Sequence, residues 1–196
     1  MARQCRENGL AYFRFDHRGC GQSEGDPADA ADFNGRCRDL RCAIDFLRNN
    51  FDLNPKIGLF GSSLGGAVCL SVSATAAVHA LVTVAAPLSS RSLIDAANGV
   101  VPAGLSADLA LSPRFCFDLS GSLSSLSNLL IFHGENDSVV PVSHARELFK
   151  KAGHPKKLVI QENGDHVMSL PLHQKIFMQE SLVWFSTLLK TGLKSE

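Results

Sequence analysis

Short apolar segments alternate along the chain with longer segments of helical period. The apolar segments are rich in Val, Ile, Leu or Phe and are bounded by Gly, Pro or Asp; they are Leu10–Asp16, Lys56–Gly61, Ala80–Ala85, Leu129–His133 and Lys157–Gln161. Such runs are typical of strands that are buried on both faces of a parallel sheet. The alternation therefore predicts an α/β fold, in which a mainly parallel sheet is flanked by helices.

Three further segments have the apolar spacing of helices that pack on a sheet. In Phe33–Asn49, apolar residues recur at three- and four-residue spacing. Ser143–Lys151 starts with a Ser that can cap a helix and ends before Gly153. Leu172–Leu189 repeats apolar residues over its whole length, so we expect it to form a terminal helix that covers the sheet.

The segment Leu88–Asn128 differs from the rest because it is rich in Ser and Gly and has no strong period. Long excursions between strands of α/β proteins tend to be lids or caps over a site. We therefore expect one domain over residues 1–196, with a lid at 88–128. Phe115 and Phe117 in this segment favour a substrate with an uncharged acyl or aromatic group.

Composition excludes several classes of protein. Of the 196 residues, 45% are hydrophobic and 19% are charged, which is a globular balance, and 19 basic residues cancel 19 acidic ones. With no net charge, attraction to nucleic acid or anionic lipid is not expected. The longest apolar stretches, such as Ala80–Leu88, are shorter than the roughly 18 residues of a membrane span. We expect a soluble, cytoplasmic protein.

The six cysteines are spread along the chain without any Cys-x-x-Cys pair. This spacing indicates neither a zinc site nor a dithiol redox motif, and we expect reduced, mostly buried thiols. No metal ion or organic cofactor is implied.

The most informative motif is Gly61-Ser62-Ser63-Leu64-Gly65, which follows a predicted strand and precedes a segment of small and apolar residues. A Gly-x-Ser-x-Gly turn between strand and helix is the context of a nucleophile elbow. The serine is exposed on a strained turn, and the glycines on either side remove Cβ atoms where strand and helix approach. Ser63 is the candidate nucleophile, and the backbone N–H of Leu64 is the candidate oxyanion donor.

A nucleophilic serine needs a base to accept its proton and an acid to orient that base. Asp137 follows the strand at Leu129–His133, and His166 follows the next predicted strand. Because the carboxyl ends of parallel strands share one edge of the sheet, we expect Ser63, Asp137 and His166 to meet there. Glu135 is the rival acid, His133 is the rival base, and Cys20 is an alternative nucleophile.

The chain resembles the α/β-hydrolases, and most closely the branch of small esterases and serine aminopeptidase-like proteins. Four ordered motifs carry the resemblance: Phe15-Asp16-His17-Arg18-Gly19-Cys20-Gly21-Gln22-Ser23, the elbow at Ser63, His133-Gly134-x-x-Asp137-x-x-Val140-Pro141, and Gly164-Asp165-His166. The resemblance implies that Ser63 is the nucleophile, Asp137 the acid and His166 the general base. In the first motif, we expect Asp16 and Arg18 to form a structural ion pair.

The chain departs from this family at its N-terminal side. Family members have three strands before the one expected at Leu10–Asp16, and a His-Gly loop that supplies a second oxyanion donor. The third of those strands separates the strands that correspond here to Leu10–Asp16 and Lys56–Gly61. We expect one of three solutions: the sequence lacks an N-terminal part, the two strands pair directly, or a second chain fills the gap in a homodimer.

Together these features predict a serine hydrolase that cleaves small carboxylic esters through an acyl-enzyme on Ser63. Amide, peptide or thioester hydrolysis would use the same residues and remains an alternative. A truncated, non-catalytic protein of the same fold is the alternative from another class.

Overall fold

The computed structural model of the chain describes residues 1–51, 56–91 and 113–189. Its described residues form one sheet of four strands in the order β1-β2-β3-β4, and every neighbouring pair is parallel. The strands are β1 (Gly58–Ser62), β2 (Ala80–Val84), β3 (Leu129–Gly134) and β4 (Lys156–Gln161). The predicted α/β class and the parallel sheet flanked by helices are confirmed.

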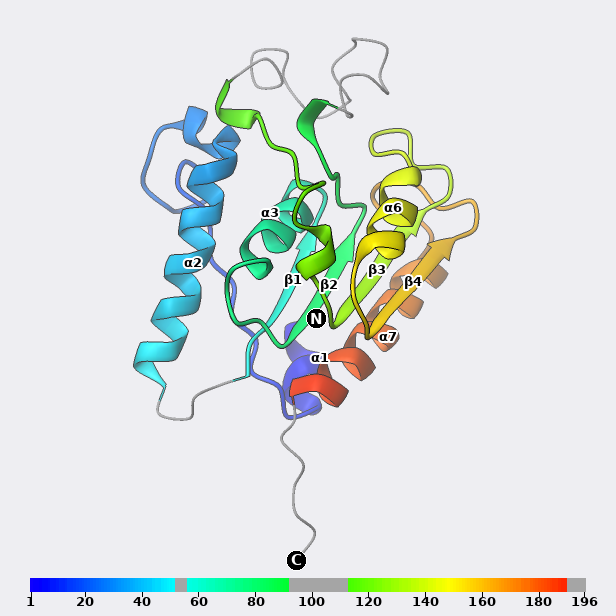
Figure 1. The fold of residues 1–196 in the computed structure, drawn as a ribbon. Coiled ribbons are helices and arrows are strands. Elements are labelled where there is room, and N and C mark those ends of the chain that lie inside the picture. Colours follow the sequence, from blue (N-terminus) through cyan, green and yellow to red (C-terminus); the bar gives the residue numbers. More distant parts are fainter. Residues whose placement is uncertain (52–55, 92–112, 190–196) are drawn as a thin grey trace, which may run out of the picture.

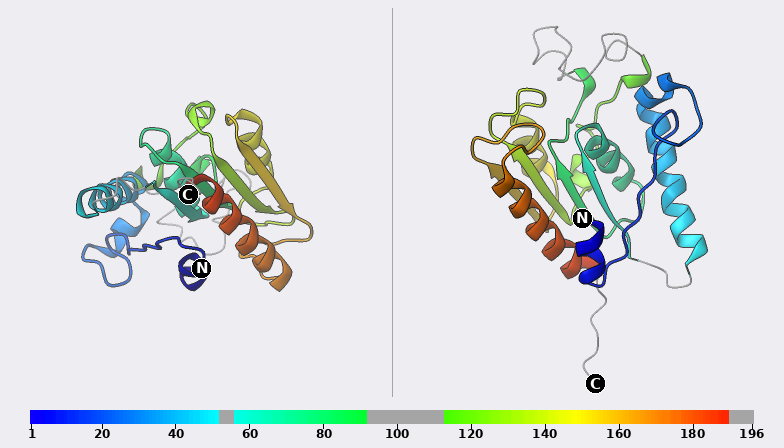
Figure 2. Two further views of the ribbon diagram at one scale, coloured as in Figure 1. Left: turned by 90° about the horizontal axis from the view of Figure 1, so that it is seen from below. Right: turned by 180° about the vertical axis from the view of Figure 1, so that it is seen from behind.

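Helices cover both faces of the sheet (Figures 1 and 2). One face packs against α2 (Phe33–Asn50), α3 (Leu64–Ser73) and α6 (Ser143–Lys151), and the other face packs against α7 (Pro171–Leu189). A short helix, α1 (Ala2–Glu7), lies near α7. Three 3-10 turns complete the described elements: η1 (Pro27–Ala31), η2 (Pro113–Phe115) and η3 (Leu123–Ser125).

These four strands form where the apolar runs predicted them, because the backbone N–H and C=O groups of each strand are hydrogen-bonded to a neighbouring strand. β2 and β3 are buried at every position, as expected of the central strands of a parallel sheet. The helices also begin and end within a residue or two of their predicted ends. At the start of α2, the Asp32 carboxylate accepts a hydrogen bond of 2.8 Å from the backbone N–H of Gly35.

The predicted strand at Leu10–Asp16 is wrong. In the described structure this segment pairs with no strand, and β1 pairs only with β2, so the expected direct pairing with Lys56–Gly61 is wrong as well. Phe13 stacks instead on Phe46 of α2, with 6.1 Å between the ring centroids. An apolar run becomes a strand only when its backbone pairs with a strand edge, and this segment does not pair with the outer edge of β1, which has no partner in the described residues.

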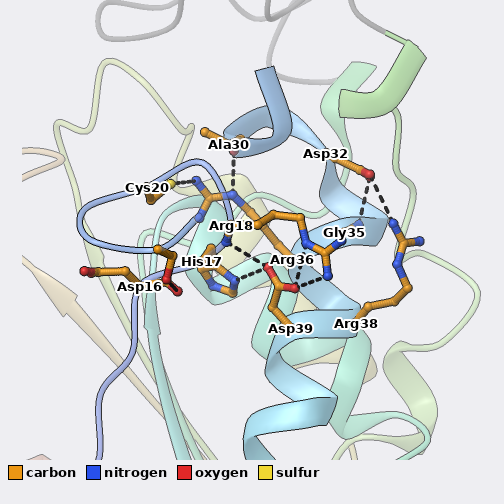
Figure 3. A network of polar contacts seen from close by, with 11 residues as sticks. Asp16, His17, Arg18, Cys20, Ala30, Asp32, Gly35, Arg36, Arg38 and Asp39 are labelled. Atoms are coloured by element: carbon orange, nitrogen blue, oxygen red, sulfur yellow. Dashed lines mark hydrogen bonds and ion pairs between the residues drawn. The ribbon is translucent and has the colours of Figure 1, made fainter. Parts of the chain in front are cut away.

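The expected ion pair between Asp16 and Arg18 is also wrong. Arg18 reaches α2, where its Nε donates to Asp39 Oδ1 over 2.8 Å (Figure 3). The Asp16 carboxylate instead accepts from the backbone N–H of Gln22 over 3.1 Å, inside its own turn. A Cβ at Gly21 would lie 2.2 Å from Asp16 Oδ2, so glycine is required for this closure. Asp16 thus closes the turn and Arg18 ties it to α2.

The lid expected at 88–128 falls largely on residues 92–112, which lie outside the described residues. The described residues on the two sides of 92–112 are hydrogen-bonded to each other, since the backbone N–H of Ser90 donates to Phe117 O over 3.0 Å. Phe115 and Phe117 are buried, and Phe117 stacks on Phe33 with 4.2 Å between the centroids. The interpretation that these two rings select the substrate is therefore wrong, because they are part of the core.

Only half of the six cysteines are buried, fewer than expected. Cys5, Cys37 and Cys69 are buried, Cys20 is partly exposed, and Cys42 and Cys116 are exposed; all six are free thiols. Burial raises the pKa of the Cys69 thiol to about 12. Cys69 therefore behaves as a small core residue rather than as a nucleophile.

Candidate active site

Ser63 lies between the end of β1 and the start of α3 in a strained conformation. Its φ is 51° and its ψ is −126°, which is unusual for a residue with a side chain. The turn is held in place because the backbone N–H of Ser63 donates to Val84 O over 2.8 Å, next to the end of β2. The expected strained elbow is thus present in the structure.

The glycines around Ser63 are not equivalent. A Cβ at Gly61 would lie 2.3 Å from the carbonyl oxygen of Gly65, so a side chain there would force strand and helix apart. A Cβ at Gly65 would meet nothing within 4 Å. The second close approach is at Gly66, where a Cβ would lie 2.7 Å from the Cβ of Ala86. The motif therefore correctly assigned this steric role to Gly61, but Gly66 rather than Gly65 is the second glycine that needs it.

Asp137 is in the loop that follows β3, with its side chain fully buried. Its Oδ1 accepts backbone hydrogen bonds of 2.8 Å from both Val139 and Val140, and its Oδ2 lies 2.8 Å from Nδ1 of His166. Burial alone would raise the pKa of Asp137, but hydrogen bonds from His133, His166 and the two backbone N–H groups outweigh it and hold this pKa well below its usual range. Asp137 is therefore an ionised carboxylate at neutral pH.

His166 connects Asp137 to Ser63. It lies in the loop after β4, with Nδ1 on Asp137 and Nε2 at 3.1 Å from Ser63 Oγ. The loop is anchored on α7, where the Gln174 side chain donates to Met168 O over 2.9 Å. Because the Asp137 carboxylate accepts the proton on Nδ1, the lone pair of Nε2 is available to the serine hydroxyl.

The structure thus joins Ser63, His166 and Asp137 in one chain of hydrogen bonds at the carboxyl edge of the sheet. They come from the ends of three strands, β1, β3 and β4, and are separated in sequence by 103 and 29 residues. An imidazole that accepts from a serine hydroxyl, while a buried carboxylate orients it, can accept the serine proton during attack on a carbonyl carbon.

The rival residues are placed elsewhere. Glu135 is exposed and accepts from the backbone N–H of Asn163 over 3.3 Å. His133 is buried, with Nε2 at 2.8 Å from Val140 O. Cys20 lies in the turn near α2, where Arg36 Nη2 is 3.5 Å from its sulfur (Figure 3). These positions leave Asp137 as the acid partner of His166 and His166 as the histidine beside Ser63.

Leu64, the predicted oxyanion donor, is the first residue of α3. The N–H groups in the first turn of a helix have no partner within the helix, and the positive end of the helix dipole lies there. The backbone N–H of Leu64 therefore belongs to a group of donors that favours negative charge beside Ser63.

An apolar pocket that the sequence did not indicate opens beside His166. It is lined by residues of β1, β2, the His166 loop and α7: Phe60, Ser62, Val84, His166, Val167, Met168, Gln174, Phe177 and Met178. Most of these side chains are apolar, and none of them is acidic or basic apart from His166. The sequence does not distinguish these lining residues from core residues, because alternation along β1 and apolar spacing along α7 are also the signals of ordinary core positions.

The described ranges contain neither a cluster of metal ligands nor a membrane-spanning helix. No three or more His, Cys, Asp or Glu residues in residues 1–51, 56–91 and 113–189 gather as they would around a metal ion. In the same residues, no helix has the length and apolar character that crossing a bilayer requires.

Comparison with known families and curated proteins gives consistent matches. The family model described as "Serine aminopeptidase, S33" matches residues 1–115, which include Ser63 but neither Asp137 nor His166. The uncharacterized protein YfhR of Escherichia coli K12 is 32% identical over 163 residues, which are 82% of this chain and 55% of YfhR. The chain thus spans about half the length of the curated relatives it matches.

Solved structures share the fold. The esterase domain of a Rhodothermus marinus protein superposes with a TM-score of 0.70 and 27% identity, covering 96% of this chain and 78% of that one. The α/β-hydrolase GrgF from Penicillium sp. sh18 superposes with a TM-score of 0.78 and 18% identity, covering 96% of this chain and 83% of that one. At this level of identity the second match bears on the fold alone.

Proposed function

The chain belongs to the serine aminopeptidase S33 family of α/β-hydrolases, and from this premise we propose that it is a serine hydrolase that cleaves small carboxylic esters. The observation that carries the proposal is the hydrogen-bonded chain from Ser63 through His166 to Asp137, with distances of 3.1 and 2.8 Å. The likeness to the Rhodothermus marinus esterase domain supports an ester as the substrate.

In the first half of the proposed reaction, Ser63 Oγ attacks the ester carbonyl carbon while its proton moves to Nε2 of His166. The N–H of Leu64 donates to the oxyanion of the tetrahedral intermediate. The bond from carbon to the alcohol oxygen then breaks, and His166 gives its proton to the departing alcohol. The product of this half is an acyl ester on Ser63.

The second half repeats these steps with water. Water attacks the acyl carbon as His166 Nε2 accepts one of its protons, and the intermediate collapses with release of the carboxylic acid. The proton returns to Ser63 Oγ, so the enzyme is regenerated. Asp137 stays ionised throughout and stabilises the imidazolium form of His166, because its carboxylate is buried at 2.8 Å from Nδ1.

The pocket beside His166 supports an ester with an apolar group. Phe60, Val84 and Phe177 supply rings and a branched side chain, while Met168 and Met178 are flexible and adapt to groups of different shape. An aminopeptidase has to bind the ammonium group at the end of a peptide, for which a carboxylate is the usual partner. Among the described lining residues there is no Asp or Glu, and this favours the ester over the peptide.

The first test is a fluorophosphonate probe, which reacts only with an activated serine, followed by measurement of the intact mass. We expect one adduct on the 196-residue chain and none on Ser63→Ala. Ser62→Ala is the matched control, since it removes the neighbouring hydroxyl and leaves Ser63 in place. A folded chain that gives no adduct would contradict the proposal and favour the non-catalytic alternative.

A substrate panel then separates the ester from the alternatives. An aliphatic p-nitrophenyl ester, the matching anilide and the matching thioester share one acyl group and differ only in the leaving atom. We expect the largest kcat/KM for the ester. A larger value for the anilide or for the thioester would replace ester hydrolysis by that reaction while keeping Ser63 as the nucleophile.

A further inference from the structure

His133 is a fully buried histidine on β3, directly behind Asp137. Its side chain and that of Asp137 both have an exposed fraction of 0%. Nε2 of His133 lies 2.8 Å from Val140 O and 3.3 Å from Asp137 Oδ2. Its other ring nitrogen, Nδ1, is buried and has no hydrogen-bond partner in the part of the chain that the structure describes.

This environment determines which ring nitrogen carries the proton. Nε2 faces two oxygens that can only accept, so it must be the donor, and the same N–H is shared between them. Nδ1 has no acceptor in the described structure, so a proton there would be left without a hydrogen bond at a buried position. In its neutral form, His133 therefore carries its proton on Nε2.

The Nε2–H of His133 points at the same carboxylate oxygen that faces His166. Asp137 Oδ2 is the oxygen that orients His166, and it lies 2.8 Å from Nδ1 of that residue. An apolar side chain at 133 would avoid the unsatisfied Nδ1, so the histidine costs stability unless its Nε2–H has a use. Among the residues that the structure describes, Asp137 is the only charged group that this N–H reaches.

We propose that His133 is a positioning residue, whose Nε2–H is anchored on Val140 O and holds Asp137 Oδ2 in line with His166. The inference rests on the proposed function, because it concerns the same site. His133 donates to the carboxylate and so withdraws part of its negative charge. Without this donor, as in His133→Leu, the full charge of the carboxylate would act on His166 Nδ1.

Another histidine and further carboxylates lie near this cluster. His144 of α6 is buried, and its Nδ1 accepts from the backbone N–H of Leu88 over 3.0 Å. Burial above all, together with any positive charge on His133, lowers the pKa of His144, although Glu147 and Asp137 oppose this. In the adjoining loops, Glu135 is exposed, and the carboxylate of Asp165 is bonded to Ser169. His144 is thus held neutral at neutral pH.

Three variants test the proposal. His133→Leu removes the donor, whereas His133→Gln keeps an amide N–H that can reach the position of Nε2. Ile131→Val is the matched control, since Ile131 is buried in the apolar core two residues away on the same face of β3. Thermal unfolding by circular dichroism first checks that each variant is folded.

The readout is the rate of fluorophosphonate labelling of Ser63 as a function of pH. In His133→Leu we expect the acid limb of the profile to move to higher pH by about half a unit and the plateau rate to fall several-fold. His133→Gln and Ile131→Val should keep the acid limb of the parent chain. If His133→Leu loses stability but keeps this limb, its role is structural only and the proposal is overturned.

A second measurement needs no variant and no activity. Nitrogen-15 spectra of the imidazole groups of the parent chain report which nitrogen of His133 is protonated. We expect the neutral ring to carry its proton on Nε2 with a bare Nδ1, and a neutral ring with its proton on Nδ1 would overturn the proposal. If the parent chain gave no adduct at all, the proposed function would fail, while this spectrum would still decide the tautomer of His133.

Discussion

Gly134 and Gly164 are packed against each other, and their contact joins the loop that carries Asp137 to the loop that carries His166. A Cβ at Gly134 would lie 2.5 Å from the carbonyl oxygen of Gly164, and a Cβ at Gly164 would lie 3.0 Å from the Cα of Gly134. The same carbonyl of Gly164 accepts from the backbone N–H of Asn136 over 2.8 Å. The acid and the base are therefore held by one packed unit rather than by two independent loops.

This contact predicts that Gly134→Ala impairs the site from a distance. The added methyl group meets backbone atoms, which cannot rotate away, so the loops must separate. We expect a loss of about 1–3 kcal/mol in the free energy of unfolding and at least a tenfold slower labelling of Ser63. Gly121→Ala is the control, because a Cβ there meets nothing within 4 Å. Equal labelling rates in the two variants would contradict the prediction.

The elbow predicts opposite outcomes for its two motif glycines. Gly61→Ala places a methyl group 2.3 Å from the carbonyl oxygen of Gly65, so we expect a less stable protein in which labelling of Ser63 is lost. Gly65→Ala has open space and lies in a helix, so we expect unchanged labelling and a free energy of unfolding raised by up to about 1 kcal/mol. Urea denaturation and the labelling rate measure both effects. Failure of Gly65→Ala to label would show that the elbow has no such asymmetry.

Asp137 and Glu135 are the two carboxylates near the end of β3, and their replacement separates their roles. Asp137→Asn puts an amide beside His166 Nδ1 and favours the wrong tautomer of the ring, so we expect kcat/KM for an ester to fall by about 10⁴-fold. Glu135→Gln should change it less than twofold, because Glu135 contacts the backbone of Asn163 and not His166. Steady-state kinetics decide between them, and a larger loss in Glu135→Gln would make Glu135 the acid.

The apolar pocket predicts a change of specificity when it is filled. Met178→Trp replaces a lining side chain of α7 with a larger one, while Val183→Trp is the matched control at a position of the same helix that is 64% exposed. With p-nitrophenyl esters of two to eight acyl carbons, we expect Met178→Trp to lower kcat/KM about tenfold for the longest esters and hardly at all for the acetate. A uniform decrease across the series would mean that the pocket does not hold the acyl chain.

The depressed pKa of Asp137 predicts a loss of stability in acid. The folded state holds this carboxylate ionised to a lower pH than the unfolded chain does, so its contribution to stability is complete above the unfolded pKa of about 3.9. The contribution is lost as the pH falls through the lower pKa of the folded state. Urea denaturation should therefore show a difference between the parent chain and Asp137→Asn that is largest above pH 5 and shrinks below pH 4. A difference that is constant with pH would contradict the assignment.

The sequence alone was enough to predict the elements whose signal lies within the element itself. Apolar runs marked β1 to β4, although only β2 and β3 are buried at every position, as a strand covered on both faces requires. The motif around Ser63 predicted a strained elbow, and the order of the strands predicted that Asp137 and His166 would reach the same edge of the sheet. These inferences depend on neighbours in the chain and on the geometry of parallel strands.

Only the tertiary structure decided the features that depend on a distant partner. Leu10–Asp16 has the pattern of a strand but pairs with none in the described structure, and Arg18 pairs with Asp39, which is 21 residues away. The pocket beside His166 and the shared N–H of His133 likewise arise where separate loops and strands converge. Strand pairing, ion pairs and cavities form between segments that are distant in the sequence. The pattern of residues along one segment therefore does not predict them.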